Sequence, residues 1–127
     1  IADSAVTQLR RQGEQLCITA QNLVEFRNVA TRPPALNGLG LSIPEAETKA
    51  TIFETSFALL PETPDIFPAW KTIVSAGAVI GKRVHDARLV AVCQVHGVTH
   101  LLTFNTGHFT SLAPHCPGLS VVDPATL

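Results

Sequence analysis

The segment RVHDARLVAVC, residues 83–93, places a carboxylate directly ahead of an apolar run. If this segment is a helix, the residues at i+3, i+4 and i+7 from Asp86 are Leu89, Val90 and Cys93. Such an apolar face packs against the protein interior, where an unpaired carboxylate is costly. A cation, a set of backbone N–H groups or a metal ion must therefore offset the charge of Asp86.

Two more polar residues accompany apolar segments elsewhere in the sequence. Glu25 follows the apolar stretch LCIT and shares a predicted helix face with Asn22, Phe26 and Val29, and Asn105 follows THLLTF. Two carboxylates and an amide suit a hard cation such as Mg²⁺ or Mn²⁺, which takes oxygen ligands and keeps several waters. An ion held by Glu25 and Asp86 would activate water and clamp a phosphate, which is the chemistry of metal-assisted phosphodiester hydrolysis.

Each of these residues also has a purely structural interpretation. Asp86 could be a carboxylate that the helix macrodipole favours near a helix N-terminus. Glu25 could form an ion pair with Arg27 or Arg88. Asn105 could be a turn residue, because its short side chain bonds to nearby backbone. The pattern alone leaves both interpretations open.

Basic and histidine side chains near these positions have their own alternatives. Three basic residues flank Asp86 and either hold nucleic-acid phosphates or are simply solvated: Lys82, Arg83 and Arg88. A second group towards the C-terminus indicates a surface loop rather than a set of ligands: His108, His115 and Cys116.

Helices and strands alternate along the chain in the predicted elements. The predicted helices span residues 3–12, 21–32, 43–57, 63–76 and 86–96. The predicted strands span residues 16–19, 57–61, 99–104 and 119–123, with a loop or short helix over 105–113. Asp3 or Ser4, Thr19, the Ser42–Glu45 capping box and Thr63 mark helix starts. Gly13, Pro33 and Gly97 mark helix ends.

Short, continuously apolar strands between helices are typical of a parallel sheet that helices cover on both faces. We therefore predict an α/β fold, a single-domain three-layer αβα arrangement with a parallel sheet over residues 1–127. The carboxyl ends of parallel strands meet at one edge of such a sheet, where helix N-termini also gather. We expect Glu25, Asp86 and Asn105 to converge there.

Composition narrows the class of protein. A chain of 127 residues with 46% hydrophobic and 15% charged residues suits one packed globular domain. A net charge of −1 gives no overall basic field. The apolar runs are far shorter than the about 20 residues of a membrane-spanning helix. Cys17, Cys93 and Cys116 lack C-x-x-C spacing, so we expect reduced thiols and a cytoplasmic location.

The segments ITAQNLVEFRNVATRP, GKRVHDARLVAVCQVHGVTHLLTFNTGHF and LSVVDP, in this order, resemble a PIN domain of the kind found in VapC-type toxins. The resemblance implies a ribonuclease that cuts RNA with Mg²⁺ or Mn²⁺, acts as a homodimer and is neutralised by a cognate antitoxin protein. On the matching positions, the helix glutamate of the family falls on Glu25 and the helix-opening aspartate on Asp86. The asparagine that follows a strand falls on Asn105, which completes the implied catalytic set.

The sequence departs from this family at two positions. The family opens with a strand that carries an aspartate, and Asp3 has only two residues ahead of it. We expect residues 3–12 to be a later helix and the domain to be N-terminally truncated. His108 stands where many relatives carry an aspartate. These departures predict weak or absent cleavage and leave open a truncated or degenerate PIN-fold binding module without catalytic activity.

Overall fold

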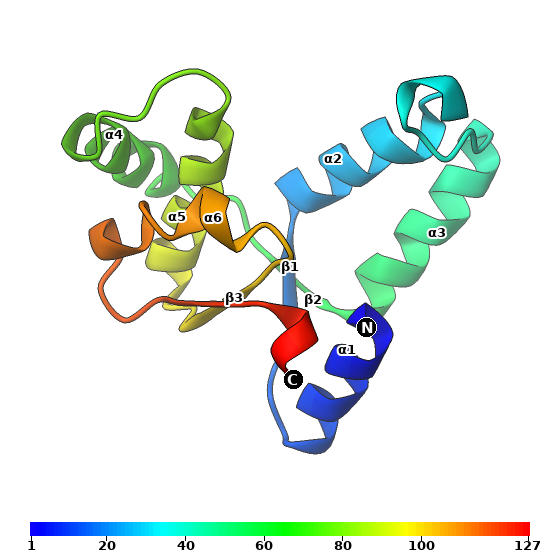
Figure 1. Cartoon of the computed structure of the whole chain (residues 1–127), viewed down its shortest axis with the longest axis horizontal. Coiled ribbons are helices and arrows are strands. Elements are labelled where there is room, and N and C mark those ends of the chain that lie inside the picture. The colour runs from blue at the N-terminus through cyan, green and yellow to red at the C-terminus, as the bar shows by residue number, and fades with distance from the viewer. The chain divides into compact units, whose positions relative to one another are not determined.

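A computed structural model describes all 127 residues of the chain (Figure 1). The chain divides into two compact units, which are described in turn. One consists of residues 15–61, and the other consists of residues 1–14 together with 62–127. No helix combines the length and the apolar character that a membrane crossing requires.

The unit of residues 15–61 contains two parallel strands that are connected along the chain by a helical hairpin. Its elements are β1 (Cys17–Thr19), α2 (Ala20–Thr31), a 3₁₀ helix (Pro34–Leu36), α3 (Ile43–Ser56) and β2 (Ala58–Leu60). Strand β1 pairs with β2 so that Ile18 lies opposite Leu59. This connection through helices is the one that parallel strands require.

Both helices of this unit begin at capping boxes. Thr19 accepts a 3.1 Å hydrogen bond from the N–H of Asn22, whose side chain accepts one of 2.9 Å from the N–H of Thr19. Ser42 and Glu45 make the same reciprocal pair at the start of α3. The backbone and hydroxyl groups of Ser42 lower the pKa of Glu45. These bonds satisfy N–H groups that helix starts otherwise leave unpaired, and they confirm the predicted starts.

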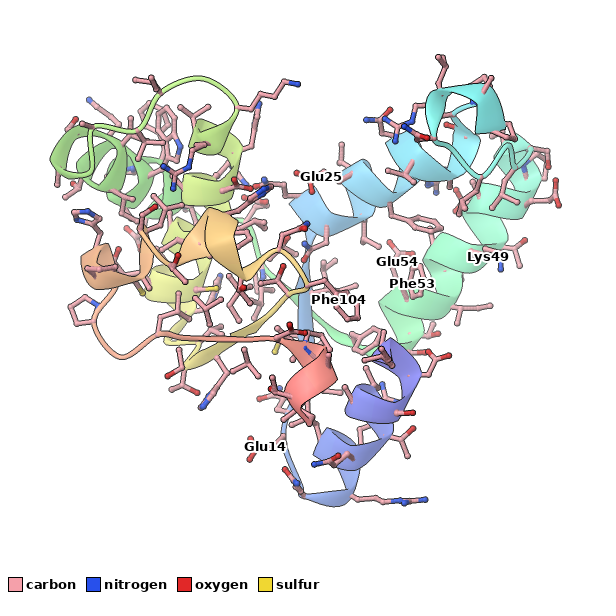
Figure 2. The ribbon with its side chains drawn as sticks, viewed as in Figure 1. Glu14, Glu25, Lys49, Phe53, Glu54 and Phe104 are labelled. Atoms are coloured by element: carbon pink, nitrogen blue, oxygen red, sulfur yellow. The ribbon has the colours of Figure 1, made fainter.

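Helices α2 and α3 approach closely because small residues lie between them. Ala30, Ala46 and Ala50 are buried. The ring of Phe53 (Figure 2) meets Phe26 edge to face, with centroids 5.0 Å apart and an interplanar angle of 88°. At the turn between the helices a Cβ at Gly38 would lie 1.9 Å from the carbonyl oxygen of Arg32, so only glycine fits there.

The unit of residues 1–14 and 62–127 contains most of the helices and a second parallel strand pair. Its elements are α1 (Ala2–Arg11), α4 (Ile66–Ala76), α5 (Arg83–His96), β3 (His100–Leu102), α6 (Thr106–Phe109), β4 (Ser120–Val122) and two 3₁₀ helices (Ala113–His115 and Pro124–Thr126). Strands β3 and β4 are parallel, with Leu101 opposite Val121.

Helix α5 is the buried element of this unit. Six of its residues are buried: Ala87 and the five from Leu89 to Cys93. It packs against α4, where the indole N–H of Trp70 donates a 2.8 Å hydrogen bond to the carbonyl oxygen of Val84. Gly97 ends the helix with a left-handed backbone (φ 67°), as the sequence predicts.

The α/β class with parallel strands is confirmed, but three details differ from the prediction. The four strands form two sheets of two strands rather than hydrogen-bonding as one. Helix α5 begins at Arg83 instead of Asp86, and α4 begins at Ile66 instead of Thr63. Helix α1 begins at Ala2, and neither Asp3 nor Ser4 caps it. Strand pairing depends on contacts between distant segments, which the local pattern does not encode.

Candidate active site

Asp86 lies in the first turn of α5, directly before Ala87, the first of the buried residues of that helix. Its side chain is 24% exposed, so the carboxylate is largely shielded yet still reachable from solvent. Leu89, Val90 and Cys93 on the same face are buried, as the spacing predicts. The helix macrodipole favours a negative charge at this position, which offsets part of the cost of shielding it.

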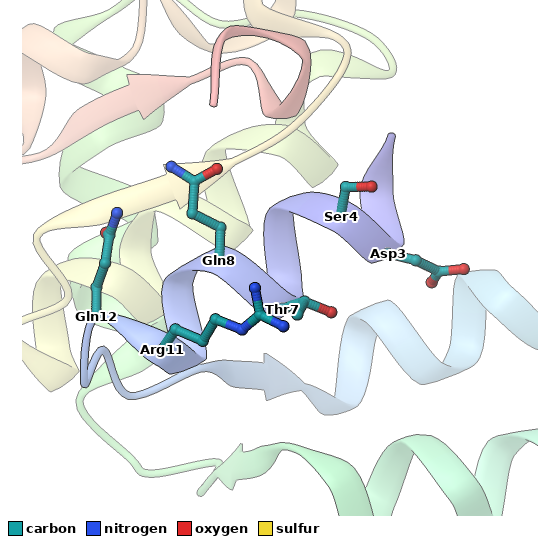
Figure 3. A pocket seen from close by; sticks show the side chains of 6 residues that line it. All are labelled: Asp3, Ser4, Thr7, Gln8, Arg11 and Gln12. Atoms are coloured by element: carbon teal, nitrogen blue, oxygen red, sulfur yellow. The ribbon is translucent and has the colours of Figure 1, made fainter.

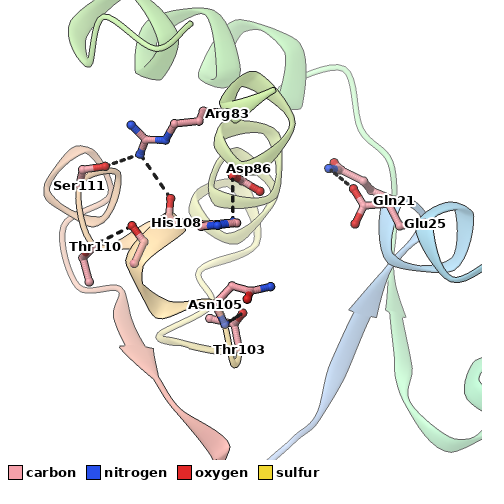
Figure 4. A network of polar contacts seen from close by, with 10 residues as sticks. Gln21, Glu25, Arg83, Asp86, Thr103, Asn105, His108, Thr110 and Ser111 are labelled. Atoms are coloured by element: carbon pink, nitrogen blue, oxygen red, sulfur yellow. Dashed lines mark hydrogen bonds and ion pairs between the residues drawn. The ribbon is translucent and has the colours of Figure 1, made fainter. Parts of the chain in front are cut away.

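His108 faces Asp86 from helix α6 (Figure 4). The Nδ1 atom of His108 is 3.9 Å from Oδ2 of Asp86, which is too long for a hydrogen bond. The two groups form an ion pair only when the imidazole is protonated. The His108 side chain is 64% exposed, so the pair opens to solvent on the histidine side.

Arg83 fixes the short helix α6 beside the start of α5. Its guanidinium donates a hydrogen bond to the hydroxyl of Ser111 and one of 3.4 Å to the carbonyl oxygen of His108 (Figure 4). Phe109, next along α6, is buried and anchors the same turn. Arg83 thus positions the backbone of His108 relative to Asp86.

The other two basic residues near Asp86 differ from each other. Arg88 donates a 2.7 Å hydrogen bond to Glu62, and this contact lowers the pKa of Glu62. Lys82, the residue before α5, is exposed. Of the three predicted phosphate-binding residues, Arg88 pairs with a carboxylate and Arg83 bonds to Ser111 and to the backbone of His108, whereas Lys82 is exposed at the start of α5.

Asn105 lies at the N-cap of α6, directly after the segment that contains β3. Its N–H donates a 3.0 Å hydrogen bond to Thr103 Oγ1, and its carbonyl oxygen accepts one of 3.0 Å from the N–H of His108. The Asn105 side chain is exposed and makes no capping hydrogen bond. The backbone of Asn105 therefore has the predicted turn role, and its amide group is accessible to a ligand.

Glu25 lies on α2 in the unit of residues 15–61. It is exposed, which corrects the expectation of an inward-facing carboxylate on the face of Phe26. Gln21, one turn earlier, donates a 3.2 Å hydrogen bond to Glu25 Oε1. Arg27, one of its predicted ion-pair partners, pairs with Glu47. Because Asp86 and Asn105 belong to the other unit, the convergence of all three residues stays a prediction.

The model of the PIN domain family matches residues 2–113 of the chain. The chain belongs to the PIN domain family. No curated protein and no solved structure matches it. PIN domains are generally metal-dependent nucleases that act on RNA or other nucleic acids. The family, the dependence on a divalent metal and the class of substrate therefore agree with the sequence prediction.

Carboxylate, imidazole and amide groups are donor types that a divalent ion accepts, and Asp86, His108 and Asn105 supply one of each. The carboxylate of Asp86 lies in the first turn of α5, and the imidazole of His108 lies on α6. The exposed amide of Asn105 lies at the N-cap of α6. Neither unit brings together three or more His, Cys, Asp or Glu side chains around a common point. An ion held here would keep several water molecules, as hydrated Mg²⁺ and Mn²⁺ sites do.

His108 is the residue whose role the sequence pattern did not predict. The pattern assigned it to a surface loop with His115 and Cys116, and only the family resemblance placed it where many relatives carry an aspartate. The structure places it beside Asp86.

The PIN domain has a pocket remote in sequence from all these residues. It is lined by polar side chains of α1 alone: Asp3, Ser4, Thr7, Gln8, Arg11 and Gln12 (Figure 3). A single helix face offers few converging groups, and none of the predicted site residues belongs to it. We therefore assign the chemistry to Asp86 and its neighbours rather than to this pocket.

Proposed function

We propose that this PIN domain is a metal-dependent endoribonuclease of the VapC toxin type that hydrolyses RNA phosphodiester bonds. The observation that carries the proposal is the shielded carboxylate of Asp86, with an imidazole and an amide on the adjacent helix start. Asp86 and Glu25 are the proposed metal ligands for Mg²⁺ or Mn²⁺. Asn105 is the proposed third catalytic residue, which orients the bound water or the phosphate.

The bound ion would supply an activated water molecule and charge stabilisation for the phosphate. The protein's own groups have separate tasks. Lys82 attracts the phosphate backbone, since its ammonium group is exposed at the start of α5. Arg83 keeps α6 in place through Ser111 and the carbonyl of His108. The shielding of Asp86 limits competing water and strengthens its attraction for a cation.

The proposal includes a cognate antitoxin protein, a homodimer and a cytoplasmic location. Large apolar side chains on and near the α2–α3 hairpin are exposed: Val24, Leu36, Leu39, Ile43 and Ile52. Exposed large apolar side chains in this part of the chain suit a protein partner. The three free cysteines suit a reducing compartment.

A second candidate is a PIN-fold module that binds RNA or protein without cleaving. The small number of possible metal ligands within each unit favours this binding module, because the side chain paired with Asp86 is an imidazole rather than a second carboxylate. In this module the PIN fold would be degenerate, and Asp86 would serve the helix dipole alone.

Cleavage of a labelled single-stranded RNA in Mn²⁺ separates the two candidates. Loss of a residue that only hydrogen-bonds to a metal ligand typically costs about 10–100-fold in activity. We expect Asp86→Asn and Glu25→Gln, which each remove a proposed ligand, to reduce the cleavage rate by more than that. Asp65→Asn and Glu54→Gln are matched controls, because both residues are exposed acids on the same respective units. Equal rates for Asp86→Asn and Asp65→Asn would exclude the nuclease proposal, and binding without cleavage would support the module.

A further inference from the structure

We infer that Asp86 and His108 form a mixed oxygen–nitrogen metal site that prefers transition-metal ions such as Mn²⁺ and Co²⁺ over Mg²⁺. The inference deepens the proposed function and rests on it for the role of the ion. It concerns which ion this chain selects, and it depends on a residue that the proposed catalytic set does not contain.

The spacing of the two side chains suits one bridging ion. Their nearest donor atoms, Oδ2 of Asp86 and Nδ1 of His108, are 3.9 Å apart. Transition-metal bonds to carboxylate oxygen and imidazole nitrogen are each about 2.0–2.2 Å, so two of them span at most about 4.2–4.3 Å. An ion can therefore reach both atoms without a backbone shift, and a small turn of the exposed His108 ring brings the angle between the two bonds towards the values that metal ions adopt.

Asp86 and His108 belong to different helices, and each helix is fixed by its own contacts. Asp86 is part of α5, whose next residues are buried. His108 is part of α6, which Arg83 fastens through the carbonyl oxygen of His108 and the hydroxyl of Ser111. Buried Phe109 anchors the same turn. The backbone positions of the two donor residues are thus set by packing and hydrogen bonds, so the binding of an ion has to order only the exposed imidazole of His108.

The chemical nature of the two donor atoms determines the preference for transition-metal ions over Mg²⁺. Mg²⁺ takes oxygen ligands almost exclusively, and it releases its waters reluctantly. An imidazole nitrogen suits transition-metal ions, and their affinity for such a site rises from Mn²⁺ to Co²⁺. Beside the carboxylate oxygens, which both kinds of ion accept, the imidazole of His108 is a good ligand for Co²⁺ and a poor one for Mg²⁺. The exposure of His108 leaves the remaining positions of the ion to water or an RNA phosphate.

Isothermal titration of tag-free protein with Mg²⁺, Mn²⁺ and Co²⁺ at pH 8, together with the visible absorption of bound Co²⁺, tests the inference. We expect the wild type to bind Co²⁺ at least about tenfold more tightly than Mg²⁺. His108→Ala should lose most of that Co²⁺ affinity without a gain for Mg²⁺. His108→Asp should reduce the Co²⁺-to-Mg²⁺ ratio by raising the Mg²⁺ affinity. The Co²⁺ spectrum should change in both variants.

His100→Ala is the matched control, because His100 is an exposed histidine of β3 in the same unit. It should leave the affinities and the spectrum unchanged. Unchanged ion selectivity in both His108 variants, or equal Mg²⁺ and Co²⁺ affinities in the wild type, would overturn the inference. Altered selectivity without RNA cleavage would reject the proposed function alone. Cleavage that needs Asp86, together with unchanged ion selectivity in both His108 variants, would reject the inference alone.

Discussion

At the scale of single residues, burial distinguishes side chains that can react from those that cannot. Asp86 is shielded on one side and open on the other, which is the environment in which a carboxylate can bind a cation without full exposure. The three cysteines show the same principle in a form that is simple to measure. Cys93 and Cys116 are buried, whereas Cys17 is partly exposed.

The cysteines give a prediction about chemical reactivity. Burial raises the pKa of the Cys116 thiol, so at pH 8 less of it is the reactive thiolate. Native protein treated with iodoacetamide should be modified first at Cys17, with Cys116 reacting at least about tenfold more slowly until urea is added. Mass spectrometry of the peptides measures each rate. Equal rates at Cys17 and Cys116 in native protein would contradict the burial of Cys116.

At the scale of elements, the caps determine where the helices that carry the candidate residues begin. Helix α2 carries Glu25 and starts at Thr19, a buried residue at the end of β1. The cap therefore links the last residue of a strand to the first turn of a helix. Its loss would loosen the first turn of α2, which lies just ahead of Glu25.

Removal of this cap should have a measurable effect on stability. Thr19→Ala deletes the hydroxyl that accepts a hydrogen bond from the N–H of Asn22, so the free energy of unfolding should fall by about 1–2 kcal/mol. Thr19→Ser keeps the hydroxyl and should lose less. Urea denaturation followed by circular dichroism measures the difference.

Thr31→Ala is the control for this change, since Thr31 is an exposed threonine on the same helix whose hydroxyl bonds only to the carbonyl oxygen of Arg27. Its effect should stay within about 0.5 kcal/mol. Equal effects at Thr19 and Thr31 would show that the capping box contributes nothing to α2.

At the scale of the whole molecule, the apolar core is distributed unevenly between the two units. The largest fully buried side chains are Ile66, Ile73, Val90, Val92 and Leu112, all in the unit of residues 1–14 and 62–127. In residues 15–61 the buried side chains are Thr19 and three alanines. The unit that carries Asp86 and His108 therefore has the more extensive hydrophobic stabilisation.

A pair of identical substitutions tests where the core lies. Ile73 is 1% exposed, so Ile73→Val should lower the free energy of unfolding by about 0.5–1.5 kcal/mol through the lost methylene and the cavity that it leaves. Ile80 in the same unit is 80% exposed, and Ile80→Val should change stability by less than about 0.5 kcal/mol. Thermal or urea unfolding compares the two. A larger effect at Ile80 would contradict the assignment of the core.

The sequence by itself determined the features that depend on residues within one or two turns. The Ser42–Glu45 box, the Thr19 cap and the glycine end of α5 form where their hydrogen-bonding groups stand in the chain. The alternation of helices with short apolar strands was equally sufficient for the α/β class. The position of Asp86 on an otherwise buried face also follows from spacing alone.

Only the tertiary structure decided which distant segments meet. It paired β1 with β2 and β3 with β4, exposed Glu25, and set His108 of α6 opposite Asp86 of α5. These outcomes depend on packing and hydrogen bonds between segments far apart in the chain, such as the contact of Arg83 with Ser111. A local pattern states what each residue can do, whereas its partner is selected by the free energy of the whole fold.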